Sequence, residues 1–90
     1  MKLPVMYDNL SPKERREVRE EYIRLQGGLC WWCNKPLNIP AVIKKPINLK
    51  LFPPNFMKYP IHLQHDHKTG LTEGAVHNYC NAVLWQYYGR

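Results

Sequence analysis

Apolar side chains recur at helical spacing in the first third of the chain. Val18, Tyr22 and Leu25 lie three or four residues apart, the spacing that places side chains on one face of a helix. The preceding residues, Ser11–Glu14, form a start signal, because serine can cap, proline suits the first helical position and glutamate completes a capping box. The QGG sequence that follows is typical of a helix end. The pattern therefore predicts a helix over residues 11–27.

The pattern changes after this helix. Residues 36–60 hold six of the eight prolines, which excludes a long helix, and their lysines and apolar side chains predict an irregular, partly packed loop rather than disorder. Residues 61–67 and 71–76 read as two short strands, and the KTG between them supplies a hairpin turn whose glycine can adopt a positive φ. Aliphatic and aromatic side chains then predict a final helix, so residues 61–88 form a strand–strand–helix unit.

Length and charge narrow the class of protein. Ninety residues make one domain, 1–90, with little core, and chains of this size often gain stability from a structural metal. The net charge of +6 favours a polyanionic partner, nucleic acid before membrane phosphates, because no basic helix has a clean apolar face. The N-terminus has no apolar signal region, and no apolar run reaches the roughly 18 residues of a membrane span. We therefore expect an intracellular, cytoplasmic protein whose cysteines bind metal rather than form disulfides.

All three cysteines occur in two short motifs that suit zinc. CWWC contains Cys30 and Cys33, within a predicted knuckle at residues 28–35, and HNYC contains His77 and Cys80. Cysteine and histidine are the ligands that zinc prefers, and two such pairs can close a tetrahedral site. The alternative for the first pair is two buried thiols beside the neighbouring tryptophans. A metal site accounts for every cysteine, so the sequence predicts a structural Zn²⁺ with these four ligands.

The order of the motifs along the chain resembles a known nuclease family. The sequences QGGLCWWC, QHDHKTG and GAVHNYCN match the patterns QGG-x-C-x-x-C, D-H-D-H-x-x-G and G-x-x-C-x-x-C-N of the recombination endonuclease VII branch of HNH nucleases, which is widespread in phages. The resemblance covers about residues 10–85. It implies an α+β protein in which a zinc-stapled ββα-metal (His-Me finger) nuclease core carries an N-terminal helix and a proline-rich loop. It also implies a DNA endonuclease that hydrolyses phosphodiester bonds and leaves 5′-phosphate and 3′-hydroxyl ends.

The same resemblance implies roles for four residues. His65 matches the general base, since an imidazole titrates near neutral pH and can take a proton from the attacking water. Asn81 matches an asparagine that holds a catalytic Mg²⁺ or Mn²⁺ ion, whose charge stabilises the phosphorus centre and the leaving oxygen. His67 matches a second histidine beside the scissile phosphate. Lys68 could add positive charge to the same DNA phosphate.

Two positions depart from the family pattern: His77 stands where the second pair has its first cysteine, and Gln64 stands just before the general base. The residue before the general base is usually an aspartate that binds the ion, and here it is Gln64, whose neutral amide is a weaker ligand for Mg²⁺. Asp66 is the nearest carboxylate, and three roles are open to it: it replaces the missing ligand, orients a histidine or caps the hairpin turn. Strand alternation would place Gln64 and Asp66 on one face and His65 and His67 on the other. The second ligand of the catalytic ion is therefore Gln64 or, alternatively, Asp66.

Several alternatives stay open. The pattern assigns no role to His62, which is an ordinary strand histidine or a DNA contact, and the charged face of the first helix is either solvated or faces DNA. A non-catalytic zinc-containing module that binds nucleic acid is the main rival to the nuclease, and a structural zinc protein of a virion is a third possibility. His65 and Asn81 favour the enzyme, whereas Gln64 favours the binding module. No helix has evident base-reading residues, so we expect low sequence specificity for DNA. If the protein is phage-encoded, we expect it in the host cytoplasm.

Overall fold

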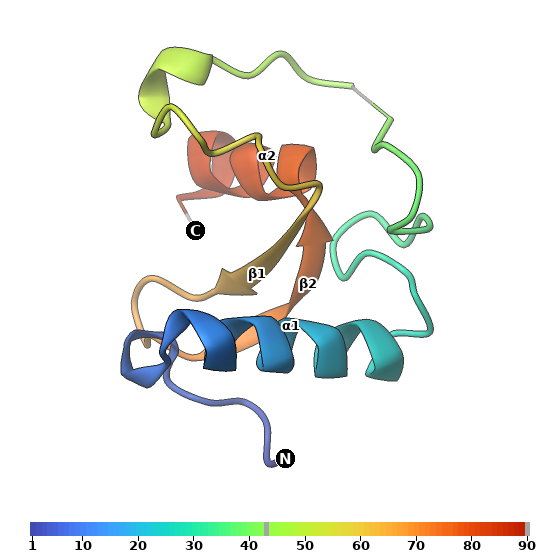
Figure 1. Ribbon diagram of the computed structural model, residues 1–90. Coiled ribbons are helices and arrows are strands. Elements are labelled where there is room, and N and C mark those ends of the chain that lie inside the picture. The colour runs from blue at the N-terminus through green and yellow to red at the C-terminus, as the bar shows by residue number, and fades with distance from the viewer. Residues whose placement is uncertain (43, 90) are drawn as a thin grey trace.

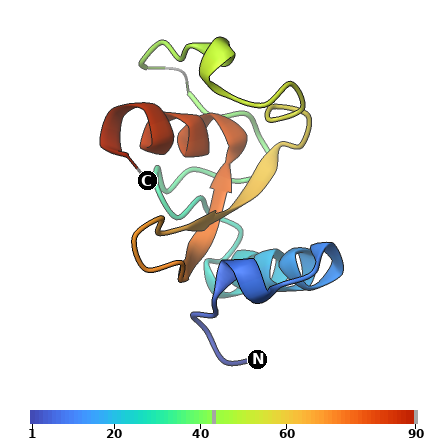
Figure 2. The same cartoon turned by 90° about the vertical axis from the view of Figure 1, so that its left-hand side faces the viewer.

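A two-stranded antiparallel sheet lies between two helices in the computed structural model, which describes residues 1–42 and 44–89 (Figure 1). The elements in chain order are η1 (Tyr7–Asn9), α1 (Pro12–Leu25), η2 (Leu49–Leu51), β1 (Ile61–His65), β2 (Thr72–His77) and α2 (Asn78–Tyr88), where η marks a short 3₁₀ helix. Both helices contact both strands, and the view turned by 90° again shows α1 and α2 on opposite sides of the sheet (Figure 2). The predicted α+β class is confirmed.

The helix α1 begins with the capping box that the sequence predicts. The Ser11 hydroxyl accepts a hydrogen bond from the Glu14 N–H at 3.2 Å, and the Glu14 carboxylate accepts one from the Ser11 N–H at 3.0 Å. These two bonds satisfy main-chain donors that a helix start otherwise leaves unpaired. Val18 and Tyr22 are buried in the core, so this face of α1 packs against the sheet.

The end of α1 is fastened to β2 by a glutamine. Both atoms of the Gln26 side-chain amide bond to the main chain of Ala75, each at 2.9 Å. Leu25, the last residue of α1, is 59 % exposed although its spacing predicts the buried face. Gln26 makes the contact with the sheet instead, and this contact sets where the chain leaves α1 toward the cysteines.

The hairpin turn begins earlier than the sequence predicts. A bulge lies between Gln64 and His65, and β1 ends at His65. The Asp66 N–H donates to the Leu71 carbonyl at 2.9 Å, and the Gly70 N–H donates to the Asp66 carbonyl at 2.7 Å. Gly70 has the positive φ expected of the turn glycine, 79°. The last two residues of the predicted strand therefore lie in the turn, where strand alternation no longer sets the side-chain directions.

The residues before α1 fold back along this turn. The Tyr7 N–H donates to the Gly70 carbonyl, and the Thr72 N–H donates to the Val5 carbonyl, both at 2.9 Å. The Thr72 hydroxyl also lies 2.9 Å from the Tyr22 hydroxyl of α1. These bonds hold the N-terminal segment against the start of β2 and bring Tyr7 to the end of β1.

The hydrophobic core draws on both helices, both strands and the segment that follows α1, and it includes two of the predicted zinc ligands. Its buried members are Val18, Tyr22, Cys30, Leu37, Leu63, Ala75, Val76, Tyr79, Cys80 and Val83. Because Cys30 and Cys80 belong to this cluster, the metal site and the core are one packed region. Of the residues described, none belongs to a helix with both the length and the apolar character needed to cross a membrane.

Apart from η2 and an isolated bridge between Pro36 and Leu29, the proline-rich segment 36–60 is irregular in its described part, and it is fastened to α2. The Tyr79 hydroxyl accepts hydrogen bonds from the N–H groups of Lys44 and Lys45 at 3.2 and 2.8 Å. The Gln86 side chain accepts one from the Asn48 N–H at 2.8 Å. The segment is thus held by main-chain bonds to side chains of α2, in agreement with a partly packed loop.

Candidate functional site

The four predicted zinc ligands meet although they come from two distant parts of the chain. Cys30 and Cys33 lie in the turn after α1, His77 is the last residue of β2, and Cys80 lies in the first turn of α2. Their sulfur and nitrogen ligand atoms all lie within 4.8 Å of one another. Three thiols and one imidazole form a donor set typical of structural zinc sites. The cluster could therefore hold a structural Zn²⁺.

The turn that carries the first two cysteines docks directly on β2. The Trp31 N–H donates to the Ala75 carbonyl at 2.9 Å, and the Asn34 N–H donates to the Cys30 carbonyl at 3.0 Å. Asn34 has a φ of 61°, a left-handed conformation that asparagine tolerates better than most residues. A Cβ at Gly74 would lie 2.7 Å from Trp31 Cγ. The close approach of this turn to β2 thus requires glycine at position 74.

The His77 ring is oriented with one nitrogen toward the sulfurs. Its Nδ1 lies 3.4 Å from the Cys33 Sγ and 3.6 Å from the Cys80 Sγ. Its Nε2 lies 2.8 Å from the Pro36 carbonyl oxygen, which can only accept, so Nε2 carries the proton. A hydrogen bond of this kind from the far nitrogen fixes the tautomer of metal-binding histidines. Nδ1 is therefore the ligand atom of His77.

The charge state of Cys30 also suits a cation. A hydrogen bond with the Cys80 thiol lowers the pKa of Cys30 to about 4, against the effect of burial, and backbone N–H groups, including that of Cys33, act in the same direction. The same hydrogen bond raises the pKa of Cys80. The thiolate is the form that binds metal. All three cysteines are free of disulfides, as a metal site requires.

The predicted general base lies at the end of β1, in a stack of rings. The His65 imidazole is parallel to the Tyr7 ring, with a centroid distance of 4.0 Å and an interplanar angle of 11°. The His67 ring lies 4.6 Å from His65 and meets the Trp85 ring edge-on at 4.9 Å. The two predicted catalytic histidines are thus neighbours. The contact with Tyr7 had no signal in the sequence, because it depends on the N-terminal segment folding back.

The surroundings of His65 keep its imidazole neutral near pH 7. Burial lowers the pKa of His65 below its usual value of about 6.5, and the electrostatic effect of the neighbouring His67 acts in the same direction. Arg15 also lowers this pKa, whereas the carboxylates of Asp8 and Asp66 raise it. A neutral imidazole has a free lone pair, which a general base needs.

Asn81, the predicted ion ligand, is buried in the first turn of α2 with an exposure of 8 %. Its Nδ2 lies 2.9 Å from Nδ1 of His62, and its Oδ1 has no hydrogen-bond partner among the described residues. A buried, unpartnered oxygen suits a cation, because hard cations take amide oxygens as ligands. The sequence assigned His62 no role. Its position two residues before Gln64 was the one available signal, since residues two apart share a strand face.

Gln64 is almost fully buried, with an exposure of 2 %. Its Nε2 donates to the His65 carbonyl at 2.9 Å and to the Glu73 carboxylate at 3.3 Å. The amide nitrogen is therefore engaged, and the oxygen is the atom that a cation would take. The role of Gln64 as an ion ligand stays a prediction.

Asp66 caps the hairpin turn, one of the three roles open to it from the sequence. Its Oδ1 accepts hydrogen bonds from the Lys68 N–H at 2.7 Å and from the Thr69 N–H at 3.4 Å. The Lys68 side chain is exposed, on the same turn as His67. A role for Asp66 as an ion ligand also stays a prediction.

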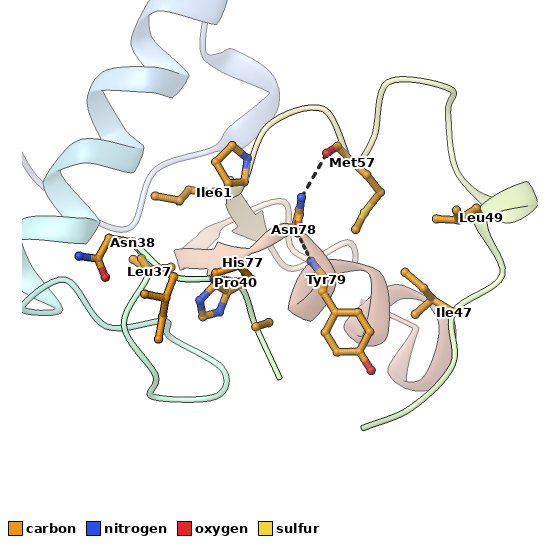
Figure 3. Close-up of a pocket in the computed structure, with 13 residues that line it drawn as sticks. Leu37, Asn38, Pro40, Ile47, Leu49, Met57, Ile61, His77, Asn78 and Tyr79 are labelled. Atoms are coloured by element: carbon orange, nitrogen blue, oxygen red, sulfur yellow. Dashed lines mark hydrogen bonds between the residues drawn. The ribbon is translucent and has the colours of Figure 1, made fainter. Parts of the chain in front are cut away.

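A separate cavity of about 760 Å³ lies between the proline-rich loop and the start of α2 (Figure 3). Its described lining is mainly apolar and includes His77 but none of the residues predicted for catalysis. At its edge, Asn78 Nδ2 donates to the Met57 carbonyl at 3.2 Å, and Asn78 Oδ1 accepts from the Tyr79 N–H at 2.6 Å. These bonds fasten the loop to α2, so we assign this cavity to loop packing.

Comparisons with protein-family models, with curated proteins and with solved structures find no match to this chain. No activity therefore follows from a relative. Among the described residues, the candidate functional features are the Cys₃His cluster, the neighbouring histidines at the end of β1, and the unpartnered oxygen of Asn81.

Proposed function

We propose that the protein is a metal-dependent DNA endonuclease with a structural zinc and a catalytic Mg²⁺ or Mn²⁺ ion. The observation that carries this proposal is the Asn81 Oδ1, buried without a partner among the described residues, on the helix that follows the hairpin bearing His65. An oxygen ligand and a neutral histidine in one strand–strand–helix unit suit the hydrolysis of a phosphodiester. The motif order, which resembles that of HNH nucleases, supports the same activity.

In this proposal His65 acts as the general base. It takes a proton from a water molecule while the water oxygen forms a bond to phosphorus. The bond from phosphorus to the 3′ oxygen breaks, the electron pair leaves with that oxygen, and solvent protonates it. The products are 5′-phosphate and 3′-hydroxyl ends. His67 and Lys68 would donate hydrogen bonds to the phosphate and so hold it beside His65.

The catalytic ion would be held by Asn81 through Oδ1, with Gln64 or Asp66 as a further ligand. When bound, such an ion supplies positive charge to the phosphorus centre and the leaving oxygen. The amide of Asn81 is oriented by His62, and the side chain is buried, so its oxygen is held in one direction.

DNA is the proposed partner because the net charge is +6, and phosphate contacts dominate the affinity of such proteins. Contacts to phosphate do not distinguish one base sequence from another, in keeping with low sequence specificity. The zinc cluster would act in folding alone, since its four protein ligands leave no open position for substrate.

A plasmid-nicking assay tests the proposed activity. Supercoiled plasmid is incubated with zinc-loaded protein in Mg²⁺, in Mn²⁺ and in EDTA. We expect relaxed circles with either ion and none in EDTA. Intact plasmid under all three conditions, from protein that is folded and contains zinc, would contradict the nuclease.

The second candidate is a non-catalytic zinc-containing module that binds nucleic acid. Gln64 favours it, because a neutral amide stands at the position expected for a carboxylate, and its nitrogen already bonds to Glu73. Such a module would bind DNA with the same affinity in Mg²⁺ and EDTA and would leave plasmid intact. The nicking assay combined with a binding titration separates the two functions.

A further inference from the structure

A cleft of about 580 Å³ opens on the side of the molecule that carries α1. Residues of α1, of the segment 55–59, of β1 and of the first turn of α2 all contribute to its lining. His62 and Asn81 are among them, so the cleft reaches the proposed ion ligand. It is separate from the apolar cavity beneath the proline-rich loop.

The lining of this cleft is positively charged. Arg15, Arg16 and Arg19 all belong to it, and among the described residues that line it there is no carboxylate. Arg15 and Arg19 are four residues apart and so share a face of α1. A guanidinium binds phosphate oxygens through paired N–H donors. The rings of Phe56 and Tyr59 also line the cleft, and arginines interleaved with aromatic rings are typical of nucleic-acid grooves.

Two polar atoms in the lining residues are buried without a hydrogen-bond partner in the described part of the chain, Arg15 Nε and Asn81 Oδ1. One is a donor and the other an acceptor. Leaving either buried and unpaired costs free energy, so a ligand that pairs with both would be stabilised. A phosphate oxygen of a DNA strand can accept from Arg15, and a cation can take the Asn81 oxygen.

The cleft is also linked to the proposed general base. The Arg15 guanidinium carbon lies 4.2 Å from the centroid of the Tyr7 ring, and the other partner of that ring is His65, stacked at 4.0 Å. Arg15, Tyr7 and His65 thus form one continuous row. A strand with its phosphate at His65 would have its neighbouring nucleotide beside the arginines.

We propose that this cleft binds the backbone of the DNA strand next to the phosphate that is cut, with Arg16 and Arg19 contacting phosphate and Arg15 completing the site. The inference rests on the proposed function, which supplies DNA as the substrate. It adds the path that the DNA strand takes across α1. It also selects, of the two roles open for the charged face of α1, the one that faces DNA.

The test measures DNA affinity separately from cutting. Zinc-loaded protein with His65→Ala is titrated into a short fluorescent DNA duplex at several salt concentrations, with and without Arg16→Gln and Arg19→Gln together. Glutamine keeps the helix propensity of these exposed or half-buried positions, and Arg15 is retained because it packs on Tyr7. The control is Arg24→Gln, a single arginine-to-glutamine change on the same helix outside the cleft, where Arg24 pairs with Glu21.

We expect the double variant to bind DNA about five- to tenfold more weakly and to show a salt dependence that is shallower by about one to two units of slope. Arg24→Gln should bind as the parent does. Equal affinity of the double variant and the parent would overturn the proposal. So would an equal loss in Arg24→Gln, or tighter binding to an RNA duplex of the same sequence.

The failure of this inference is distinguishable from the failure of the nuclease. If the protein with His65 intact leaves plasmid uncut while its DNA affinity depends on Arg16 and Arg19, the cleft is supported and the catalytic proposal is contradicted. If it cuts plasmid while its affinity for DNA is the same with and without these arginines, the nuclease is supported and the proposed DNA-binding role of the cleft is overturned.

Discussion

The side-chain amide of Asn81 is held by His62, with Asn81 Nδ2 2.9 Å from His62 Nδ1. Burial lowers the pKa of His62, so its imidazole is neutral near pH 7 and Nδ1 can accept a hydrogen bond. An acceptor at this point directs the amide nitrogen toward His62 and leaves Oδ1 for another partner. His62 is therefore a positioning residue for the proposed ion ligand.

Replacing His62 by phenylalanine tests this role. The new ring would keep the edge-on packing against Phe56, now at 4.8 Å, but would lose the acceptor for Asn81. We expect the Mg²⁺ concentration for half-maximal cleavage to rise about tenfold, as when a ligand loses its orienting partner. His62→Gln offers an acceptor again and should restore part of the affinity. A titration of the nicking rate with Mg²⁺ measures this concentration for both variants. An unchanged Mg²⁺ concentration for half-maximal cleavage in His62→Phe would show that His62 does not position Asn81.

The zinc cluster should be necessary for folding. Structural zinc supplies on the order of 10 kcal/mol of apparent binding free energy in small domains, so Cys33→Ser should unfold the protein or lower its melting temperature strongly. Lys35→Ser, at an exposed position of the same turn, is the control and should melt like the wild type. Elemental analysis of fresh protein should give one zinc per chain, and a value well below one would argue against the site.

The cleavage rate should depend on pH through His65. Below its pKa the imidazolium has no free lone pair, so the rate should fall toward acid pH. The lowered pKa of His65 places the midpoint of this fall below about 6.5, with a plateau at neutral pH. Tyr7→Ala would expose the ring, raise the pKa of His65 toward its usual value and move the fall to higher pH. A pH–rate profile of both proteins checks this, and identical midpoints would show that the Tyr7 stack does not control the base.

Local signals in the sequence predicted the two helices, the hairpin and the zinc cluster, but not the pairs that complete the proposed site. The capping box at Ser11 and Glu14 needs only neighbours in sequence, and the two zinc half-sites each span four residues. The pair of His62 and Asn81 depends on the approach of β1 to α2. The stack of Tyr7 on His65 depends on an N-terminal segment with no periodic pattern. Such contacts are set by tertiary packing, which residue spacing does not encode.

The identity of the second ion ligand can be decided with two substitutions. Gln64→Asp would provide a carboxylate, which attracts a divalent cation more strongly than an amide, so the metal concentration for half-maximal cleavage should fall, most of all for Mg²⁺. Asp66→Asn keeps the Oδ1 acceptor that caps the turn at Lys68, so the hairpin should survive and cleavage should change little. No change in Gln64→Asp together with a large loss in Asp66→Asn would move the ligand to Asp66.

The most direct test of the nuclease proposal compares wild type and His65→Ala in one plasmid-nicking experiment with Mg²⁺ and with Mn²⁺. Removal of a general base typically slows a reaction by about 10²–10⁴-fold, and we predict a loss of this size for His65→Ala. Zinc content, melting temperature and DNA affinity should stay those of the wild type, because the ring is only half-buried at the end of β1. If His65→Ala cuts as fast as the wild type, His65 is not the general base and the hairpin is not the active site.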